Sequence, residues 1–99
     1  PMTKRELVMR IAEETGLSQH QVLAVIQKTL DYIIDSLVAG KTVELREFGV
    51  FEVRTRRARV GRNPRKPKIA VAIPPRRVVK FKPGRRMRAE VSNPPAAGA

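Results

Sequence analysis

The sequence has 99 residues, which is room for one small domain, and 41% of them are hydrophobic, which excludes a wholly disordered chain. It contains no cysteine, so a disulfide framework and a thiolate metal site are excluded. The net charge of +12 is uneven: residues 1–53 carry 6 Lys/Arg and 8 Asp/Glu, whereas residues 54–99 carry 15 Lys/Arg and one acid, Glu90. A segment this basic predicts a surface that binds a polyanion.

The first third of the chain has the pattern of two capped helices. Each helix begins with a capping-box pair and stops at a glycine that can take the left-handed conformation. These residues are Thr3, Glu6 and Gly16 for the first helix, and Ser18, Gln21 and Gly40 for the second.

The second helix is apolar on two sides. One stripe can face the first helix, and the other needs a further partner. The two stripes are Val22, Ile26, Ile33 and Leu37, and Leu23, Leu30, Ile34 and Val38. A monomer that buries this helix deeply is the alternative. The remaining sequence has too few apolar residues to cover both sides, so we predict a dimer.

Beyond residue 42 the apolar period changes to two, the period of a strand. Residues 42–55 predict a hairpin interrupted at Glu47-Phe48-Gly49, where Gly49 supplies the freedom for a tight connection. A third strand is predicted at residues 76–82, with its apolar residues in the core, namely Val79 and Phe81.

Between these strands, residues 55–75 predict a long two-stranded ribbon, which we call the arm. Its flanks alternate like strands, and a glycine and two prolines near its middle mark the tip, namely Gly61, Pro64 and Pro67. The arm has too little apolar surface to pack against the rest of the domain, so we expect it to project from the sheet. A short basic helix is predicted at residues 85–91 and a disordered tail at residues 92–99.

The predicted fold is therefore α+β, with a two-helix base, a three-stranded antiparallel sheet that carries the arm, and a short C-terminal helix. We expect one domain at residues 2–91.

The charge of the arm predicts DNA binding. Lys and Arg neutralise phosphates and release counterions, which gives sequence-independent affinity that falls with salt. A flat ribbon bearing Arg fits the minor groove. The alternative is that these cations form a solvated surface with no ligand. This is disfavoured because no acidic residue lies among them to offset their mutual repulsion. The cations are Arg54, Arg56, Arg57, Arg59, Arg62, Arg65, Lys66 and Lys68.

Further candidates flank the arm. Phosphate contacts position a protein on DNA without reading sequence, and we expect them from Arg77, Lys80, Lys82, Arg85, Arg86 and Arg88. Arg46 is a candidate for a base or phosphate contact, or for pairing with a glutamate. Pro64, beside Arg62 and Asn63, is a turn residue or a rigid apolar wedge that unstacks a base step. The cationic setting favours the wedge.

Catalysis has no support in the sequence. There is one histidine, His20, and there is neither a nucleophile motif nor a phosphate-binding loop. Phe48, Phe51 and Phe81 are candidate stacking platforms for single strands, but their apolar periodicity favours the core. We expect no enzyme activity, no cofactor, no small-molecule substrate and no metal.

Three motifs in register resemble the HU/IHF family of bacterial histone-like DNA-bending proteins. They are Glu47-Phe48-Gly49-Val50-Phe51, Arg59-Val60-Gly61-Arg62-Asn63-Pro64, and Arg76-Arg77-Val78-Val79-Lys80-Phe81-Lys82-Pro83-Gly84. The resemblance covers residues 2–91 and implies an intertwined dimer whose two arms embrace double-stranded DNA. It also implies that the tip proline, Pro64 here, wedges between base pairs. The chain departs from the family at Arg65-Lys66-Pro67, where a polar residue, Thr and Gly are usual, and at Pro74-Pro75.

These observations predict a homodimer that binds and bends double-stranded DNA through the minor groove with little sequence preference, and that compacts the bacterial chromosome. Such a protein would lie in the cytoplasm, in the nucleoid, without a membrane partner. An RNA-binding protein is one alternative, disfavoured by the scarcity of exposed aromatic residues. A module that binds acidic proteins or an anionic membrane is the other, and the ribbon is not the amphipathic basic helix that membranes favour.

Overall fold

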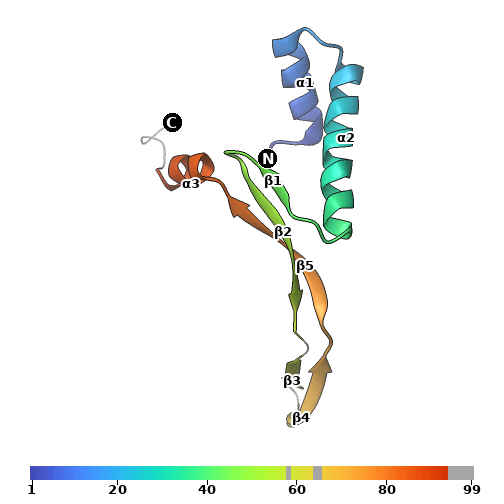
Figure 1. Ribbon diagram of the computed structural model, residues 1–99, viewed down its shortest axis with the longest axis vertical. Helices are drawn as coiled ribbons and strands as arrows, with labels where there is room; N and C mark the ends of the chain where they lie inside the picture. The colour runs from blue at the N-terminus through green and yellow to red at the C-terminus, as the bar shows by residue number, and fades with distance from the viewer. Residues whose placement is uncertain (58, 64–65, 94–99) are drawn as a thin grey trace. The chain divides into compact units, whose positions relative to one another are not determined.

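The structure is a computed structural model that describes residues 1–57, 59–63 and 66–93, with side chains described for 1–57, 61 and 74–93 (Figure 1). Its elements, in chain order, are α1 (Lys4–Thr15), α2 (Gln19–Val38), β1 (Val43–Leu45), β2 (Gly49–Arg56), β3 (Arg59–Asn63), β4 (Lys66–Ile73), β5 (Arg76–Pro83) and α3 (Arg85–Ser92). The α+β prediction is confirmed. The chain forms two compact units, which divide at residues 36 and 37. Of the predicted tail, Ser92 ends α3 and Asn93 is its C-cap, and the rest lies outside the described residues.

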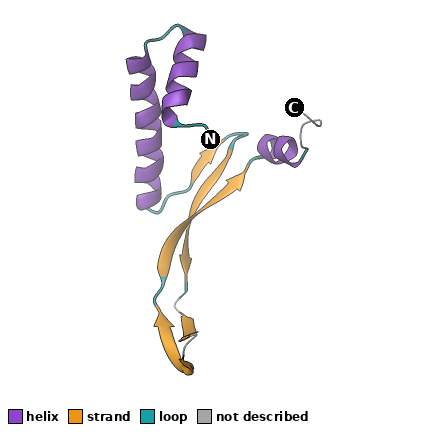
Figure 2. Ribbon diagram, turned by 180° about the vertical axis from the view of Figure 1, so that it is seen from behind, coloured by secondary structure: helices purple, strands orange, loops and turns teal. Residues whose placement is uncertain are grey.

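The first unit is a hairpin of α1 and most of α2 (Figure 2). Of the two predicted capping boxes, the one at α2 has both of its hydrogen bonds, whereas α1 has the hydroxyl cap alone. The Glu6 amide donates to Thr3 Oγ1 over 3.2 Å, and Ser18 and Gln21 exchange backbone-to-side-chain hydrogen bonds of 3.0 and 3.1 Å. Gly16 ends α1 with φ +77°. Satisfied terminal amides fix where each helix starts, so the apolar faces meet in one register.

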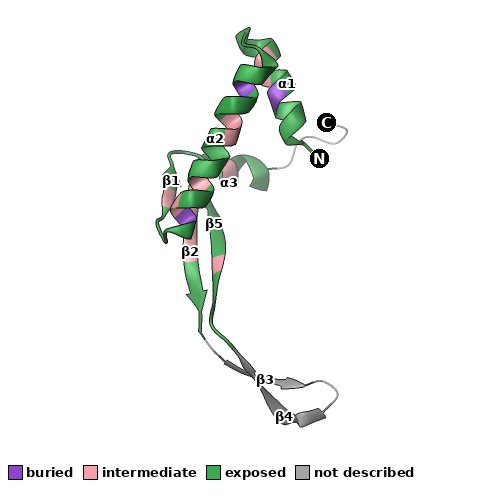
Figure 3. Ribbon diagram, turned by 90° about the vertical axis from the view of Figure 1, so that its right-hand side faces the viewer, coloured by how far each residue is buried: buried purple, intermediate pink, exposed green. Residues whose placement is uncertain are grey.

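The two sides of α2 differ in burial as the sequence predicts. Val22 and Leu37 are buried and Ile26 and Ile33 are half-buried, whereas the second stripe is exposed: Leu23, Leu30, Ile34 and Val38. Figure 3 shows how few described residues are buried. Val8, Val22 and Leu37 are the only buried hydrophobic side chains in the described part of the chain. The described part of one copy therefore has almost no core of its own.

The second unit contains an antiparallel sheet of order β1-β2-β5 and a separate antiparallel pair, β3-β4. The β2–β5 ladder runs without a shift from Gly49↔Pro83 to Arg56↔Arg76, and β3–β4 resumes at Arg59↔Ile73. Each strand advances by the same number of residues across this break, so the two pairs form one ribbon in continuous register. Pro74-Pro75 lies at the break, where proline has no amide hydrogen to donate to a ladder.

The β1–β2 turn corrects the expected role of Gly49. Its φ is not positive, and Glu47 takes the left-handed conformation instead, with φ +68°. Gly49 is required for space. A Cβ there would lie 2.5 Å from the Phe81 ring and 2.7 Å from the Lys82 carbonyl oxygen. The sequence pattern located the turn but could not reveal that β5 passes so close.

Phe48 and Phe51 cluster around Phe81 at this sheet. The ring centroid of Phe81 lies 4.7 Å from that of Phe51 and 5.7 Å from that of Phe48, in tilted arrangements that aromatic pairs favour. The cluster is incomplete, because Phe48 is 49% exposed. The expectation that Phe48, Val79 and Phe81 lie in the core is wrong for the single chain, where no described residue covers them fully: Val79 is 61% exposed and Phe81 is 36% exposed.

Candidate nucleic-acid interface

The β2–β5 pair has two chemically different faces. Successive side chains of a strand point to opposite faces, and the unshifted register assigns each residue to one of them. The first, which we call the apolar face, carries Phe51, Val53, Val79 and Phe81, followed by Thr55 and Arg77. The second, the cationic face, carries Arg54, Arg56, Arg76, Lys80 and Lys82 together with Glu52 and two valines, Val50 and Val78. One strand pair thus offers a nonpolar surface and a positively charged surface.

Glu52 organises part of the cationic face. Its carboxylate lies 3.1 Å from Lys82 Nζ and 3.5 Å from Arg54 Nη2. The hydrogen bond from Lys82 and the positive charges of Lys82 and Arg54 hold the pKa of Glu52 below its ordinary value, against a smaller opposing effect of desolvation. These are exposed ion pairs, which are weak and screened by salt, so a phosphate can replace the carboxylate.

The structure places the predicted site residues in different surroundings. Arg54, Arg56, Lys80 and Lys82 come together on the cationic face, whereas Arg77 lies on the opposite face and donates to backbone carbonyls at the end of α2. Arg85 and Arg86 begin α3, and Arg57 follows β2.

The tip region is described as backbone only. Arg59, Arg62 and Asn63 lie on β3, and Lys66 and Lys68 lie on β4. The register shifts between Arg62 and Asn63, so that Asn63 pairs with Lys66. This irregularity coincides with the departure of the sequence at Arg65-Lys66-Pro67. Pro64 and Arg65 lie outside the described residues.

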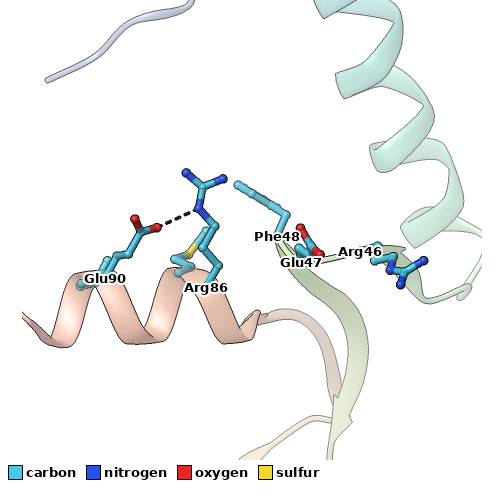
Figure 4. A pocket seen from close by; sticks show the side chains of 7 residues that line it. Arg46, Glu47, Phe48, Arg86 and Glu90 are labelled. Carbon is cyan, nitrogen blue, oxygen red and sulfur yellow. Dashed lines mark hydrogen bonds and ion pairs between the residues drawn. The ribbon is translucent and has the colours of Figure 1, made fainter.

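Arg46 and Arg86 border a hollow of about 370 Å³ between the β1–β2 turn and α3. Phe48, Met87 and Val91 supply its apolar lining. Figure 4 shows Arg86 paired with Glu90, at 2.9 Å, while the Arg46 side chain points away from α3. Among the described residues, Arg46 has no acidic partner within ion-pair distance, so the expected pairing with a glutamate is not observed.

Arg76 lies on the cationic face but is not among the residues that the sequence predicts to bind DNA. It stands opposite Arg56 at the last pair of the β2–β5 ladder. The sequence could have identified it, because residues 76, 80 and 82 are all even-numbered and alternate residues of a strand lie on the same face. Residue 77 has the other parity.

Within the described ranges, no group of three His, Asp or Glu side chains could hold a metal ion. Over the same residues, no helix combines the length and apolarity needed to cross a bilayer.

Comparisons with known proteins agree with this arrangement. Residues 2–92 match the family described as "Bacterial DNA-binding protein". A probable DNA-binding protein HU of Chlamydia trachomatis is 42% identical over 93 residues, covering 94% of this chain and 93% of the relative. Integration host factor subunit alpha of Caulobacter vibrioides is 40% identical over 90 residues, covering 91% and 89%. An Anabaena HU–DNA cocrystal structure superposes with a TM-score of 0.81 at 40% identity, covering 94% of this chain and 100% of that chain.

Proposed function

Because the chain belongs to the family of bacterial DNA-binding proteins that includes HU and integration host factor, we propose that it is a homodimer that binds and bends double-stranded DNA. The family consists of architectural proteins, not enzymes. The observation that carries the proposal is the cationic face of β2 and β5, five cations with one acid, at the base of a ribbon that continues in register.

The exposed apolar surface supports the homodimer. The second stripe of α2 is 41–68% exposed, and the apolar face leaves Val79 and Phe81 at 61% and 36% exposure. Burial of such side chains stabilises a protein by about 1.5–3 kcal/mol each, so leaving them in water forfeits the main driving force for folding. A second copy offers the same surfaces in return, as an isologous interface requires.

The cationic face supports a phosphate-dominated mechanism. In a dimer, the two ribbons present two such faces to one duplex, with Arg56 and Arg76 where the β2–β5 ladder ends. Backbone phosphates attract these cations whatever the base sequence, so affinity is high but sequence preference is low. This property suits a protein that compacts a bacterial chromosome, and we place it in the nucleoid.

Bending is assigned to the arms. Ribbons that enter the minor groove can bend DNA by tens of degrees when an apolar side chain unstacks a base step, at a cost of about a few kcal/mol. Pro64 takes that role by its position in Gly61-Arg62-Asn63-Pro64, beside the register shift of β3.

The test measures affinity and bending separately, on a short duplex labelled for energy transfer at both ends. The wild-type protein should bend the duplex, and log affinity should fall linearly with log salt, by about 0.9 per phosphate contact. Pro64→Ala should reduce the bend at saturation, whereas Pro67→Ala, a matched tip proline, should not. A slope near zero, or a stronger preference for structured RNA, would overturn DNA binding through phosphates. An unchanged bend with Pro64→Ala would overturn the wedge.

A further inference from the structure

Arg77 makes the most elaborate side-chain contact in the described part of the second unit. Its Nη2 donates to the carbonyl oxygens of Leu37, at 3.1 Å, and Val38, at 3.3 Å. Its Nη1 donates a further hydrogen bond to Val38, at 3.3 Å. All three residues belong to the same compact unit. One guanidinium therefore joins β5 to the last turn of α2.

The end of α2 needs such a partner. The last carbonyls of a helix have no intrahelical donor, and a positive charge there interacts favourably with the helix dipole. The last turn of α2 contains no basic residue of its own. Gly40 closes the helix with φ +79° and satisfies Leu37 only in part, with a hydrogen bond of 2.9 Å. Arg77, 39 residues beyond Val38, supplies both the donors and the charge.

Arg77 lies in β5 close to the point where the arm begins. It stands opposite Thr55, one pair before the β2–β5 ladder ends at Arg56↔Arg76. The arm leaves the sheet at this point. Arg77 also lies on the apolar face, whereas Arg76 lies on the cationic face. Two adjacent arginines at the root of the arm thus point in opposite directions.

We propose that Arg77 is a positioning residue: it fixes the root of the arm to the end of α2 and so sets where the cationic face meets DNA, without contacting a phosphate itself. This replaces the direct DNA contact that its basic character predicted. The proposal rests on the proposed function for its effect on DNA, and on the three hydrogen bonds for the anchor.

The matched variants are Arg77→Ala and Arg76→Ala, which remove the same charge from opposite faces. In the free protein, Arg77→Ala should lower the melting temperature by about 5 °C and speed amide exchange at Thr55 and Arg56, because the anchor is lost. Arg76→Ala should change neither.

The two variants should also differ in DNA binding, where Arg76→Ala changes the salt dependence and Arg77→Ala does not. Arg76→Ala should reduce the salt slope by about 0.9 per lost phosphate contact. Arg77→Ala should keep the wild-type slope but lower affinity by about tenfold and reduce the bend at saturation, measured well below its melting temperature. Arg77→Lys keeps the charge but not the planar fork, so it should resemble Arg77→Ala.

Each of the following outcomes would contradict one part of the proposal. A reduced slope with Arg77→Ala, restored by Arg77→Lys, would make Arg77 a phosphate contact. A lower melting temperature with wild-type affinity and bend would reduce it to a structural cap. If the wild-type protein itself shows no salt-dependent DNA binding, the proposed function fails, and the exchange rates at Thr55 and Arg56 alone then decide whether the anchor exists.

Discussion

The two faces of the β2–β5 ribbon share a backbone but have opposite relations to water. The apolar face collects Phe51, Val79 and Phe81, and the exposed surface of Val79 and Phe81 needs a cover. The cationic face collects Lys80, Lys82 and their neighbours, which lose little by staying hydrated until a polyanion replaces the water. Residue parity decides on which face a side chain lies, so one thin ribbon carries both an apolar surface and a charged surface.

The largest expected effect comes from placing a charge on the apolar face. If a second copy covers this face as proposed, Val79→Asp should lower the free energy of unfolding of the dimer by about 3–5 kcal/mol, because the carboxylate would be buried without a partner. Sedimentation velocity and urea unfolding measure this. Lys80→Asp is the control from the neighbouring position, and it should remain dimeric while losing DNA affinity. Equal damage from both variants would show that the faces are not distinct.

Gly49→Ala tests how closely the strands approach. The added methyl group would lie within 2.7 Å of the Phe81 ring and of the Lys82 carbonyl, and the backbone atom cannot move aside. We expect a loss of about 1–3 kcal/mol in urea unfolding, as for other overpacked sites. A variant as stable as the wild type would mean that β2 and β5 are farther apart than described.

Glu47→Gly should stabilise the protein. Glu47 has φ +68°, a conformation that costs an L-residue about 1–2 kcal/mol and glycine almost nothing. Part of this gain is offset by the greater freedom of glycine in the unfolded chain, so we expect about 0.5–1 kcal/mol in thermal unfolding. Glu47→Ala removes the carboxylate but keeps the Cβ, and it should give no such gain. Equal stabilisation by Glu47→Gly and Glu47→Ala would show that loss of the carboxylate, and not relief of backbone strain, is the cause.

The smallest effect is the pH dependence of the cationic face. The pKa of Glu52 is lowered in the folded state by Lys82 and Arg54. Its ion pairs therefore stabilise the protein at pH values above the ordinary range of a glutamate, and this contribution disappears as pH falls through the lowered pKa. Glu52→Gln should remove this part of the pH dependence in thermal melts from pH 3 to 7. It should also raise DNA affinity, because Lys82 and Arg54 lose a competing anion. Unaltered pH dependence would contradict the assignment.

Local chemistry explains what the sequence predicted well. Capping residues act within four positions, so Ser18 and Gln21 identify the start of α2 without tertiary information. The two stripes of α2 follow from helical periodicity in the same way, and Leu23 and Ile34 are exposed as predicted. Composition alone indicates that the arm region is basic.

The remaining features depend on contacts distant in sequence. Gly49 has its role because Phe81, 32 residues later, crosses it. The charge of Arg77 alone does not distinguish it from the other basic residues, because its parity in β5 and its acceptors on α2 are tertiary features. For Pro64, the sequence remains the sole basis of its assigned role.

Because so few of the described side chains are buried, folding of the chain should be coupled to association with a second copy. With Val8, Val22 and Leu37 as its buried hydrophobic residues in the described part, a lone chain has little to gain by folding. When a second copy supplies the cover, folding and association become one bimolecular reaction governed by mass action. The melting temperature should then rise with protein concentration, and the amount of folded protein in a cell should depend more steeply than linearly on the rate of synthesis.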